Sequence, residues 1–319
     1  MSIKEILSNN VKKVIKYGVG ESDSHRNKFI PKTGLDLAIH LTTHCNLNCK
    51  NCDTYAPIAS KGEQDLDSLE RDLKRLSEIM GSDRIHTLHL SGGEPLMHSR
   101  IEEIPSLVRK YLPRTYIYFI TNGILLPKLS DKFYSECHDN FINIEVTIYP
   151  IKFDYENAFK LVKSKGVQIV NYHEHEPVKT SWHFPVNFDG ACDPVKSFTV
   201  CDRANYCHVL YDHKLYTCSA IPRVRILNEY FNTNIPISDY DGINIYDAKT
   251  GEEILEFLAH PIPFCRFCDH EKYTYGHKWG ISKKSITEWS SCEPNELRNK
   301  LYSANINLHE SKYEKEQKK

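Results

Sequence analysis

Three cysteines stand close together in the chain, at Cys45, Cys49 and Cys52, with the spacing C-x3-C-x2-C. Three thiolates so near each other in sequence can hold three irons of a [4Fe-4S] cluster, and they leave the fourth iron without a protein ligand. Such an iron is open to chemistry. The simpler alternatives are a zinc site or buried free thiols. Structural zinc usually takes four ligands, typically from paired C-x2-C knuckles, and the triplet has no close fourth ligand.

A glycine motif follows about forty residues later, as Gly92-Gly93-Glu94-Pro95. It comes directly after the apolar run 85–90, just as the cysteines follow the apolar run 35–41. Gly-Gly pairs often mark ordinary turns. Glycine also lets a backbone approach a ligand closely, so the motif is a candidate ligand loop.

Together the cysteine triplet and the glycine motif resemble the radical S-adenosylmethionine (SAM) superfamily. In that family the open iron is chelated by the amino and carboxylate groups of SAM, and reductive cleavage gives a 5'-deoxyadenosyl radical that abstracts a hydrogen atom. The resemblance implies that Cys45, Cys49 and Cys52 ligate the cluster and that residues 92–95 contact the SAM amino group. Asn51 stands where the family often has an aromatic residue lying along the adenine.

The chain up to residue 170 alternates apolar strand patterns with amphipathic helix patterns, which predicts parallel βαβ units. A capping box at residues 67–70 predicts a helix that ends at Gly81. A further strand is expected between His183 and Val200. The predicted strands are 35–41, 85–90, 115–120, 142–148 and 167–170, and the other helices lie near 101–111, 129–138 and 154–165.

Five or six such units resemble the partial (β/α)6 TIM-like barrel of the radical SAM family. Ligands in these folds bind at the carboxyl ends of the strands. That rule singles out Thr121 and Asn122 after the third strand and Thr147 at the fourth. The resemblance implies that these polar groups face the SAM ribose or the substrate. Their alternative reading is an ordinary turn or strand end, since Asn-Gly commonly marks turns.

Cysteines return after residue 190, and two short β-like runs, 207–211 and 215–218, predict a hairpin. The spacing resembles a twitch module, the shortened SPASM domain that binds an auxiliary [4Fe-4S] cluster. The resemblance implies four ligands: Cys201, Cys218, Cys265 and Cys268. A structural zinc site is the alternative, with His270 and His277 nearby, and Cys192 is an alternative ligand.

We therefore expect four parts: an N-terminal extension (1–34), a radical SAM partial barrel (35–190), a twitch-like domain (191–284), and a C-terminal helix with a disordered tail (285–319). The tail is charged and almost devoid of apolar groups. His173 and His175 are interpreted as solvated or substrate-facing groups.

Composition sets the cellular context that we expect. The 319 residues carry a formal net charge of -1, which favours neither nucleic acid nor an anionic membrane as partner. We find no signal peptide and no apolar run of membrane-spanning length. Eleven cysteines in such a chain indicate metal ligands rather than disulfides, so we expect a cytoplasmic enzyme.

The segments 52–57, 91–95 and 121–126, with Tyr149-Pro150, resemble a radical SAM subgroup of carbohydrate and aminocyclitol biosynthesis. That resemblance implies dehydrogenation or epimerisation at a sugar carbinol, with flavodoxin or ferredoxin as electron donor. A peptide maturase is the alternative enzyme, although 34 residues before the first strand are few for a leader-binding domain. A metal-stabilised binding protein without SAM turnover is the non-catalytic alternative.

Epimerisation requires a hydrogen atom returned to the substrate radical, which a cysteine thiol can supply. Cys207 lies between the two expected ligands Cys201 and Cys218, so we expect it near the barrel mouth as the donor. Free cysteines are more often inert packing groups, which is the alternative reading. Cys192 and Cys292 are less favoured donors.

Overall fold

The computed structural model describes residues 34–81, 83–171, 178–205 and 207–292. Five parallel strands form one side of an eight-stranded sheet and pair in chain order. They are β1 (Leu35–Thr42), β2 (Ile85–Gly92), β3 (Tyr116–Thr121), β4 (Ile142–Val146) and β5 (Ile169–Asn171). All five were predicted from the apolar runs.

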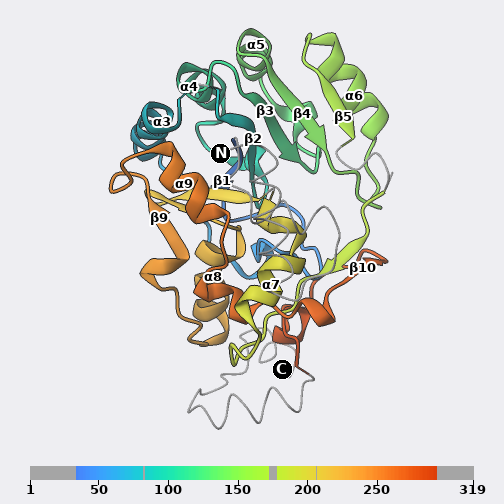
Figure 1. Cartoon of the computed structure of the whole chain (residues 1–319). Helices are drawn as coiled ribbons and strands as arrows, with labels where there is room; N and C mark the ends of the chain where they lie inside the picture. The colour runs from blue at the N-terminus through green and yellow to red at the C-terminus, as the bar shows by residue number, and fades with distance from the viewer. Residues whose placement is uncertain (1–33, 82, 172–177, 206, 293–319) are drawn as a thin grey trace, which may run out of the picture.

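Four helices alternate with these strands and lie along one face of the sheet (Figure 1). They are α3 (Leu66–Met80), α4 (Ile104–Tyr111), α5 (Asp131–Asp139) and α6 (Tyr155–Ser164). Short 3-10 turns join them: η1 (Ala56–Ile58), η2 (Pro95–Met97), η3 (Ile101–Glu103) and η4 (Leu126–Lys128). The expected α/β class, a parallel sheet with helices consistent with a partial TIM-like core, is confirmed.

The start of α3 differs slightly from its prediction. Its N-cap is Asp65, whose Oδ1 accepts a hydrogen bond from the Ser68 N–H at 2.7 Å, so the expected capping box beginning at Asp67 is wrong. The helix begins at Leu66 because that side chain is buried with the rest of the apolar face. The predicted end at Gly81 is confirmed.

The strand expected between His183 and Val200 is wrong: residues 184–200 contain no strand, and the end of this segment forms the helix α7 (Pro194–Val200). Asp193 accepts hydrogen bonds from the N–H groups of Val195 and Lys196, and proline occupies the first helical position, so this is a helix start. The adjacent β6 (Ser181–His183) pairs antiparallel with β10 (Thr274–His277), outside the main sheet.

The main sheet instead gains strands at its β1 edge. β7 (His208–Tyr211) pairs parallel with β1, and β8 (Lys214–Tyr216) and β9 (Gly242–Asn244) follow antiparallel, which confirms the predicted hairpin. The barrel and the cysteine-rich part thus share one sheet.

The remaining elements are α8 (Ala220–Phe231), α9 (Gly251–Leu258), η5 (Asp202–Asn205), η6 (Asp239–Asp241), η7 (Pro263–Phe267), η8 (His270–Lys272) and η9 (Ile286–Glu288).

Several expectations fall wholly or partly outside the described residues. They concern the N-terminal extension up to residue 33, the histidines His173 and His175, and the chain after residue 292. Of the expected C-terminal helix, residues 285–292 are described, and they contain only the 3-10 turn η9. No helix in the described parts of the chain is long and apolar enough to cross a membrane.

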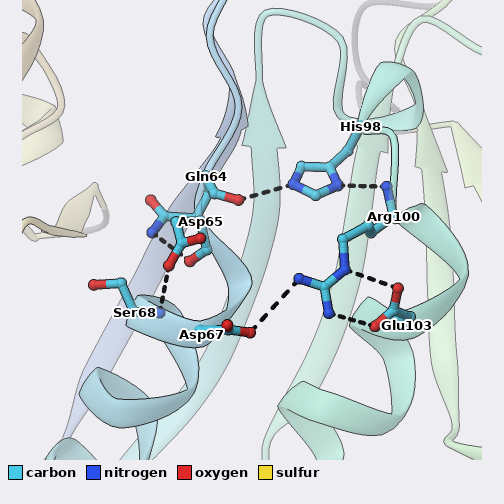
Figure 2. A network of polar contacts seen from close by, with 7 residues as sticks. All are labelled: Gln64, Asp65, Asp67, Ser68, His98, Arg100 and Glu103. Atoms are coloured by element: carbon cyan, nitrogen blue, oxygen red, sulfur yellow. Dashed lines mark hydrogen bonds and ion pairs between the residues drawn. The ribbon is translucent and has the colours of Figure 1, made fainter.

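A polar network fixes the segment after β2 to the start of α3 (Figure 2). His98 Nδ1 accepts from the Arg100 N–H at 3.0 Å, so Nε2 carries the hydrogen and donates to the Gln64 carbonyl at 2.9 Å. The Arg100 guanidinium bonds Glu103 at 2.7 and 2.8 Å and lies 3.6 Å from Asp67. The loop after β2 is thereby held in place at the carboxyl end of that strand.

The hairpin turn between β7 and β8 is held by a buried carboxylate on α3. Asp212 and His213 both adopt positive φ, of 47° and 65°, where glycine is ordinarily favoured. The His213 ring is 2.6 Å from Asp72 Oδ1, and the Tyr246 hydroxyl donates to the same oxygen at 3.1 Å. Asp72 is only 3% exposed, so this contact stabilises a turn conformation that histidine alone disfavours.

This contact predicts that the effect of His213→Gly on stability changes sign when the Asp72 carboxylate is removed. Asp72→Ala should lower the free energy of unfolding by about 1–3 kcal/mol, because the hydrogen bonds to a charged group are lost. His213→Gly should cost stability in the wild-type background but raise it in the Asp72→Ala background, where only the strained φ remains. Chemical denaturation of the four proteins checks this. Equal effects of His213→Gly in both backgrounds would contradict it.

Candidate functional site

A cavity of about 410 Å³ opens at the carboxyl ends of the parallel strands. Its wall combines segments that follow β1, β2, β3 and β4, as the strand-end rule predicted. Of the residues expected to bind cluster or cofactor in the barrel, these line it: Cys45, Cys49, Asn51, Cys52, Gly92, Gly93, Glu94, Thr121, Asn122 and Thr147. Pro95 does not; it is buried at the start of η2, which it helps to begin.

The three cysteines lie in desolvated surroundings. Burial raises the pKa of Cys45 and of Cys49 to about 12, and it raises the pKa of Cys52 as well. The Leu47 N–H donates to the Cys45 sulfur at 3.3 Å. Such thiols resist ionisation unless a cation compensates, and metal binding displaces their protons. Three thiols that line one cavity are the donor type that an iron–sulfur cluster takes.

The three barrel cysteines line one cavity but do not form a site for a single metal ion. In residues 34–292, leaving out the undescribed positions, no three His, Cys, Asp or Glu side chains are close enough to hold a single metal ion. Tetrahedral zinc with Zn–S bonds of about 2.3 Å needs thiolates about 3.8 Å apart. A cluster of four irons is larger than one ion, so it takes ligands that stand farther apart.

The glycine motif is packed directly against the cysteine loop. A Cβ on Gly92 would lie 2.6 Å from the Thr42 carbonyl oxygen, and a Cβ on Gly93 would collide with the His44 carbonyl. The Gly93 N–H donates to Thr42 and the Glu94 N–H donates to His44, both at 2.9 Å. Only glycine at both positions allows the two loops to meet this closely.

Glu94 is an almost completely buried carboxylate, 1% exposed, at the base of the cavity. It accepts hydrogen bonds from the Thr121 hydroxyl at 2.6 Å, the Asn122 N–H at 3.0 Å and the Leu96 N–H at 3.1 Å. Burial raises the pKa of Glu94 to about 7, although these hydrogen bonds oppose the rise. A cationic group entering the cavity would stabilise its ionised form.

Asn122 joins the third strand end to the cysteine loop. Its side-chain N–H donates to Asn46 Oδ1 at 2.7 Å, and its own Oδ1 accepts from the Ile124 N–H at 3.0 Å. Thr147 is buried beside it, and its N–H donates to the Thr121 carbonyl at 2.9 Å. These residues can therefore form an ordinary turn and also face a ligand, because the turn itself places their side chains at the cavity.

The second group of cysteines comes together around a smaller cavity of about 70 Å³, which Cys201, Cys218 and Cys268 line. Cys265 lies near Cys201 and Cys218, and Cys268 lies near the other three and Cys192. Burial raises the pKa of Cys218 to about 12 and raises that of Cys265 and Cys268 as well. The structure therefore brings the four expected ligands together, with Cys192 beside them.

A charged wall separates the two cavities, and both are lined by Asn51, Asp53, Phe184 and Arg203. The Arg203 guanidinium bonds Asp53 Oδ2 at 2.7 Å and stacks 3.4 Å from the centre of the Phe184 ring. Burial would raise the pKa of Asp53, but Arg203 outweighs it and the pKa is lowered. An ionised pair is thus held between the two cysteine groups.

The sequence did not indicate several residues that build this wall or lie around the larger cavity. Asp53 directly follows a predicted ligand, which is the one signal that was present. Arg223 is buried, and it donates to His40 Nδ1 at 2.8 Å and to the Thr54 carbonyl at 2.9 Å. Trp279 and Arg203 come from far along the chain, and no local pattern marks them. Cys207, the expected hydrogen donor, does line the larger cavity.

The barrel part of the chain is similar in sequence to known proteins. Residues 39–165 match the Radical SAM superfamily. The chain is 31% identical over 131 residues to the mitochondrial GTP 3',8-cyclase of Arabidopsis thaliana, covering 41% of this chain and 32% of that protein. It is 28% identical over 147 residues to molybdenum cofactor biosynthesis protein 1 of Bos taurus, covering 46% and 22%. The chain thus spans at most a third of the length of these relatives.

Two solved structures are also similar. BtrN in complex with AdoMet and 2-DOIA shares 17% identity, with a TM-score of 0.44, and the match covers 74% of this chain and 85% of that one. Native anSMEcpe with bound AdoMet shares 16% identity, with a TM-score of 0.45, and the match covers 73% and 82%.

The raised pKa of Glu94 predicts a pH dependence of SAM binding. Its carboxyl group, with a pKa of about 7, takes up a proton as the pH falls and is then a weaker acceptor for a hydrogen bond from the SAM amino group. SAM affinity should therefore fall from about pH 8 to about pH 6, and Glu94→Gln should bind more weakly and flatten the dependence. Equilibrium binding to anaerobically reconstituted protein measures this.

The matched control is Asp72→Asn. Asp72 is another buried carboxyl, which bonds the His213 ring and the Tyr246 hydroxyl outside both cavities. That variant should keep the wild-type pH profile. Wild-type affinity and slope in Glu94→Gln, with iron content preserved, would refute the role of Glu94.

Proposed function

We propose that this protein, whose residues 39–165 match the Radical SAM superfamily, abstracts a hydrogen atom from a carbohydrate carbinol, in a sugar or an aminocyclitol. The product is the epimer or the ketone. The family uses a [4Fe-4S] cluster and SAM, which together supply a 5'-deoxyadenosyl radical when bound. The observation that carries the proposal is the single cavity in which the three cysteines, the glycine motif and Cys207 meet.

In this proposal the barrel residues bind and orient the cofactor. Cys45, Cys49 and Cys52 hold the cluster. Glu94 presents its carboxylate to the SAM amino group, and its three hydrogen-bond donors fix the position of both oxygens. Asn122 and Thr147 offer polar groups at the neighbouring strand ends. The strands keep these groups at fixed spacing, since their buried faces form the core.

The opposite wall of the cavity suits a polar substrate of small size. Charged groups from Lys179, Asp53 and Arg203 lie beside the aromatic rings of Trp182 and Phe184. Aromatic faces with a few convergent polar groups are typical of small-molecule sites, and a polyol presents both C–H faces and hydroxyls. A cavity of about 410 Å³ that also takes SAM favours a small molecule over a peptide.

A nucleotide substrate is the second candidate. The Arabidopsis relative is named as a GTP 3',8-cyclase, and its similarity lies over 131 residues. Three cations, Lys50, Lys179 and Arg203, line the cavity and would suit phosphate oxygens. The Asp53 carboxylate already neutralises Arg203, which favours the uncharged sugar.

We further propose that Cys201, Cys218, Cys265 and Cys268 hold an auxiliary [4Fe-4S] cluster. Cys201, Cys218 and Cys268 line one small cavity beyond the charged wall, and Cys265 packs with Cys201 against the same apolar cluster. In a dehydrogenation this second site would take up the electron left after hydrogen abstraction and proton loss. Flavodoxin or ferredoxin would supply the electron that cleaves SAM.

Cys207 would serve epimerisation as the hydrogen-atom donor. It lines the cavity near Arg203, and burial raises the pKa of its thiol, so it keeps its hydrogen at neutral pH. Donation to the substrate radical breaks the S–H bond and leaves a sulfur radical. That radical then needs one electron, from the electron donor, and one proton, from solvent, before the next turnover.

The test is turnover by anaerobically reconstituted, reduced protein against a panel of sugars, aminocyclitols and nucleotides in heavy water. We expect 5'-deoxyadenosine formation to rise with a sugar or aminocyclitol, together with an epimer or a ketone. Stimulation by a nucleotide alone would replace the carbohydrate proposal by the second candidate. Absence of 5'-deoxyadenosine under every condition would refute both.

In the same assay, Cys207→Ala separates the two outcomes for a carbohydrate. If the product is an epimer, the variant should still form 5'-deoxyadenosine but lose epimer and solvent deuterium incorporation. Cys137→Ala is the control, because Cys137 is buried in α5 outside both cavities. Normal epimerisation by Cys207→Ala would show that another group is the donor.

A further inference from the structure

A short strap from the far end of the chain lies across the cysteine loop. The Lys50 N–H donates to the Gly280 carbonyl and the Ser282 N–H donates to the Asn48 carbonyl, both at 2.8 Å. These bonds form an antiparallel bridge between Cys49 and the strap residue 281. We use the name strap for residues 279–282.

The strap is fixed on both sides. Upstream, β10 pairs with β6, and the Ser181 hydroxyl in β6 donates to the Lys50 carbonyl at 3.3 Å. Downstream, the buried Glu288 carboxylate accepts from the Lys283 N–H at 2.6 Å. The indole of Trp289, which is 2% exposed, then donates to the Cys52 carbonyl at 2.8 Å. Both backbone bonds of the strap are therefore supported by neighbouring structure.

The strap carries Trp279 into the larger cavity, beside Cys49. The Trp279 ring meets Tyr149 edge-on, with 6.0 Å between ring centres. Its indole Nε1 is buried, and within the described chain it has no completed hydrogen bond. A buried N–H without an acceptor is costly, so a ligand or sulfur at this position is expected to accept from it.

The Cys49 sulfur is the acceptor that the surroundings indicate. Cys49 and Trp279 line the same cavity, and the strap residue 281, two positions after Trp279, bridges the Cys49 backbone. The buried indole Nε1 has no other acceptor among the described residues. A thiolate is a stronger acceptor than a thiol, so conversion of Cys49 to a cluster ligand would complete the bond.

We propose that Trp279 is a positioning residue for the cluster, donating its indole N–H to the Cys49 thiolate while the strap closes that side of the cluster from solvent. The inference rests on the proposed function. Hydrogen bonds to ligand sulfurs and exclusion of solvent both set the reduction potential of such clusters. The donated hydrogen stabilises the reduced, more negative state, so Trp279 raises the potential.

Two substitutions separate the effect of the indole N–H of Trp279 from the effect of its ring. Trp279→Phe removes the donor and keeps an aromatic ring, so the midpoint potential of the SAM-responsive cluster should become more negative with little change in its lifetime in air. Trp279→Ala removes both, so the cluster should also be lost faster in air. Trp182→Phe is the matched control, because Trp182 lines the same cavity beside Lys179, and its variant should keep the wild-type potential.

The readout is a reductive titration followed by electron paramagnetic resonance, with iron content measured for each variant. A wild-type potential in Trp279→Phe at full iron content would overturn the inference while leaving the proposed function intact. A shift of the same size in Trp182→Phe would also overturn it, since the effect would then belong to the cavity in general. Wild-type protein that takes up no cluster would overturn the inference and the proposed function together.

Discussion

The loop that carries the three barrel cysteines depends on backbone hydrogen bonds from distant parts of the chain. Between β1 and η1 it has no helix or strand of its own, so its polar groups need other partners. Gly62 accepts from Thr43 near its start, the strap binds its middle, and Trp289 and Arg223 donate to its end. A loop held at this many points can present thiols with fixed geometry, which a cluster with one open iron requires.

The same contacts connect the loop to the second cysteine group. Asp53, one residue after Cys52, pairs with Arg203, and Arg203 lies two residues after Cys201. The sheet adds a second connection, because β7 pairs directly with β1. Neither cavity is therefore built by one segment alone. A substitution in the charged wall should alter the lining of both cavities. This arrangement suits a reaction in which a substrate radical forms in one cavity and an electron leaves through the other.

The sequence predicted those features that depend on local pattern. Apolar runs predict the five parallel strands, and the strand-end rule predicts that Thr121, Asn122 and Thr147 lie together, as they do at the cavity. The strand expected between His183 and Val200 was wrong, because the Asp193 cap and the following proline begin the helix α7 in that segment. The strap with Trp279 could not be predicted, because its partners lie some 230 residues away and only the folded chain brings them together.

The most direct measurement is the iron content of the anaerobically reconstituted protein, with zinc measured in the same samples. Two [4Fe-4S] clusters predict about eight irons per chain, and alanine at Cys45, Cys49 and Cys52 together should leave about four. One zinc with about four irons in the unmodified protein would contradict the auxiliary cluster and spare the barrel site. Iron content unchanged by the triple substitution would contradict the account at its centre, because the three cysteines would then hold no cluster.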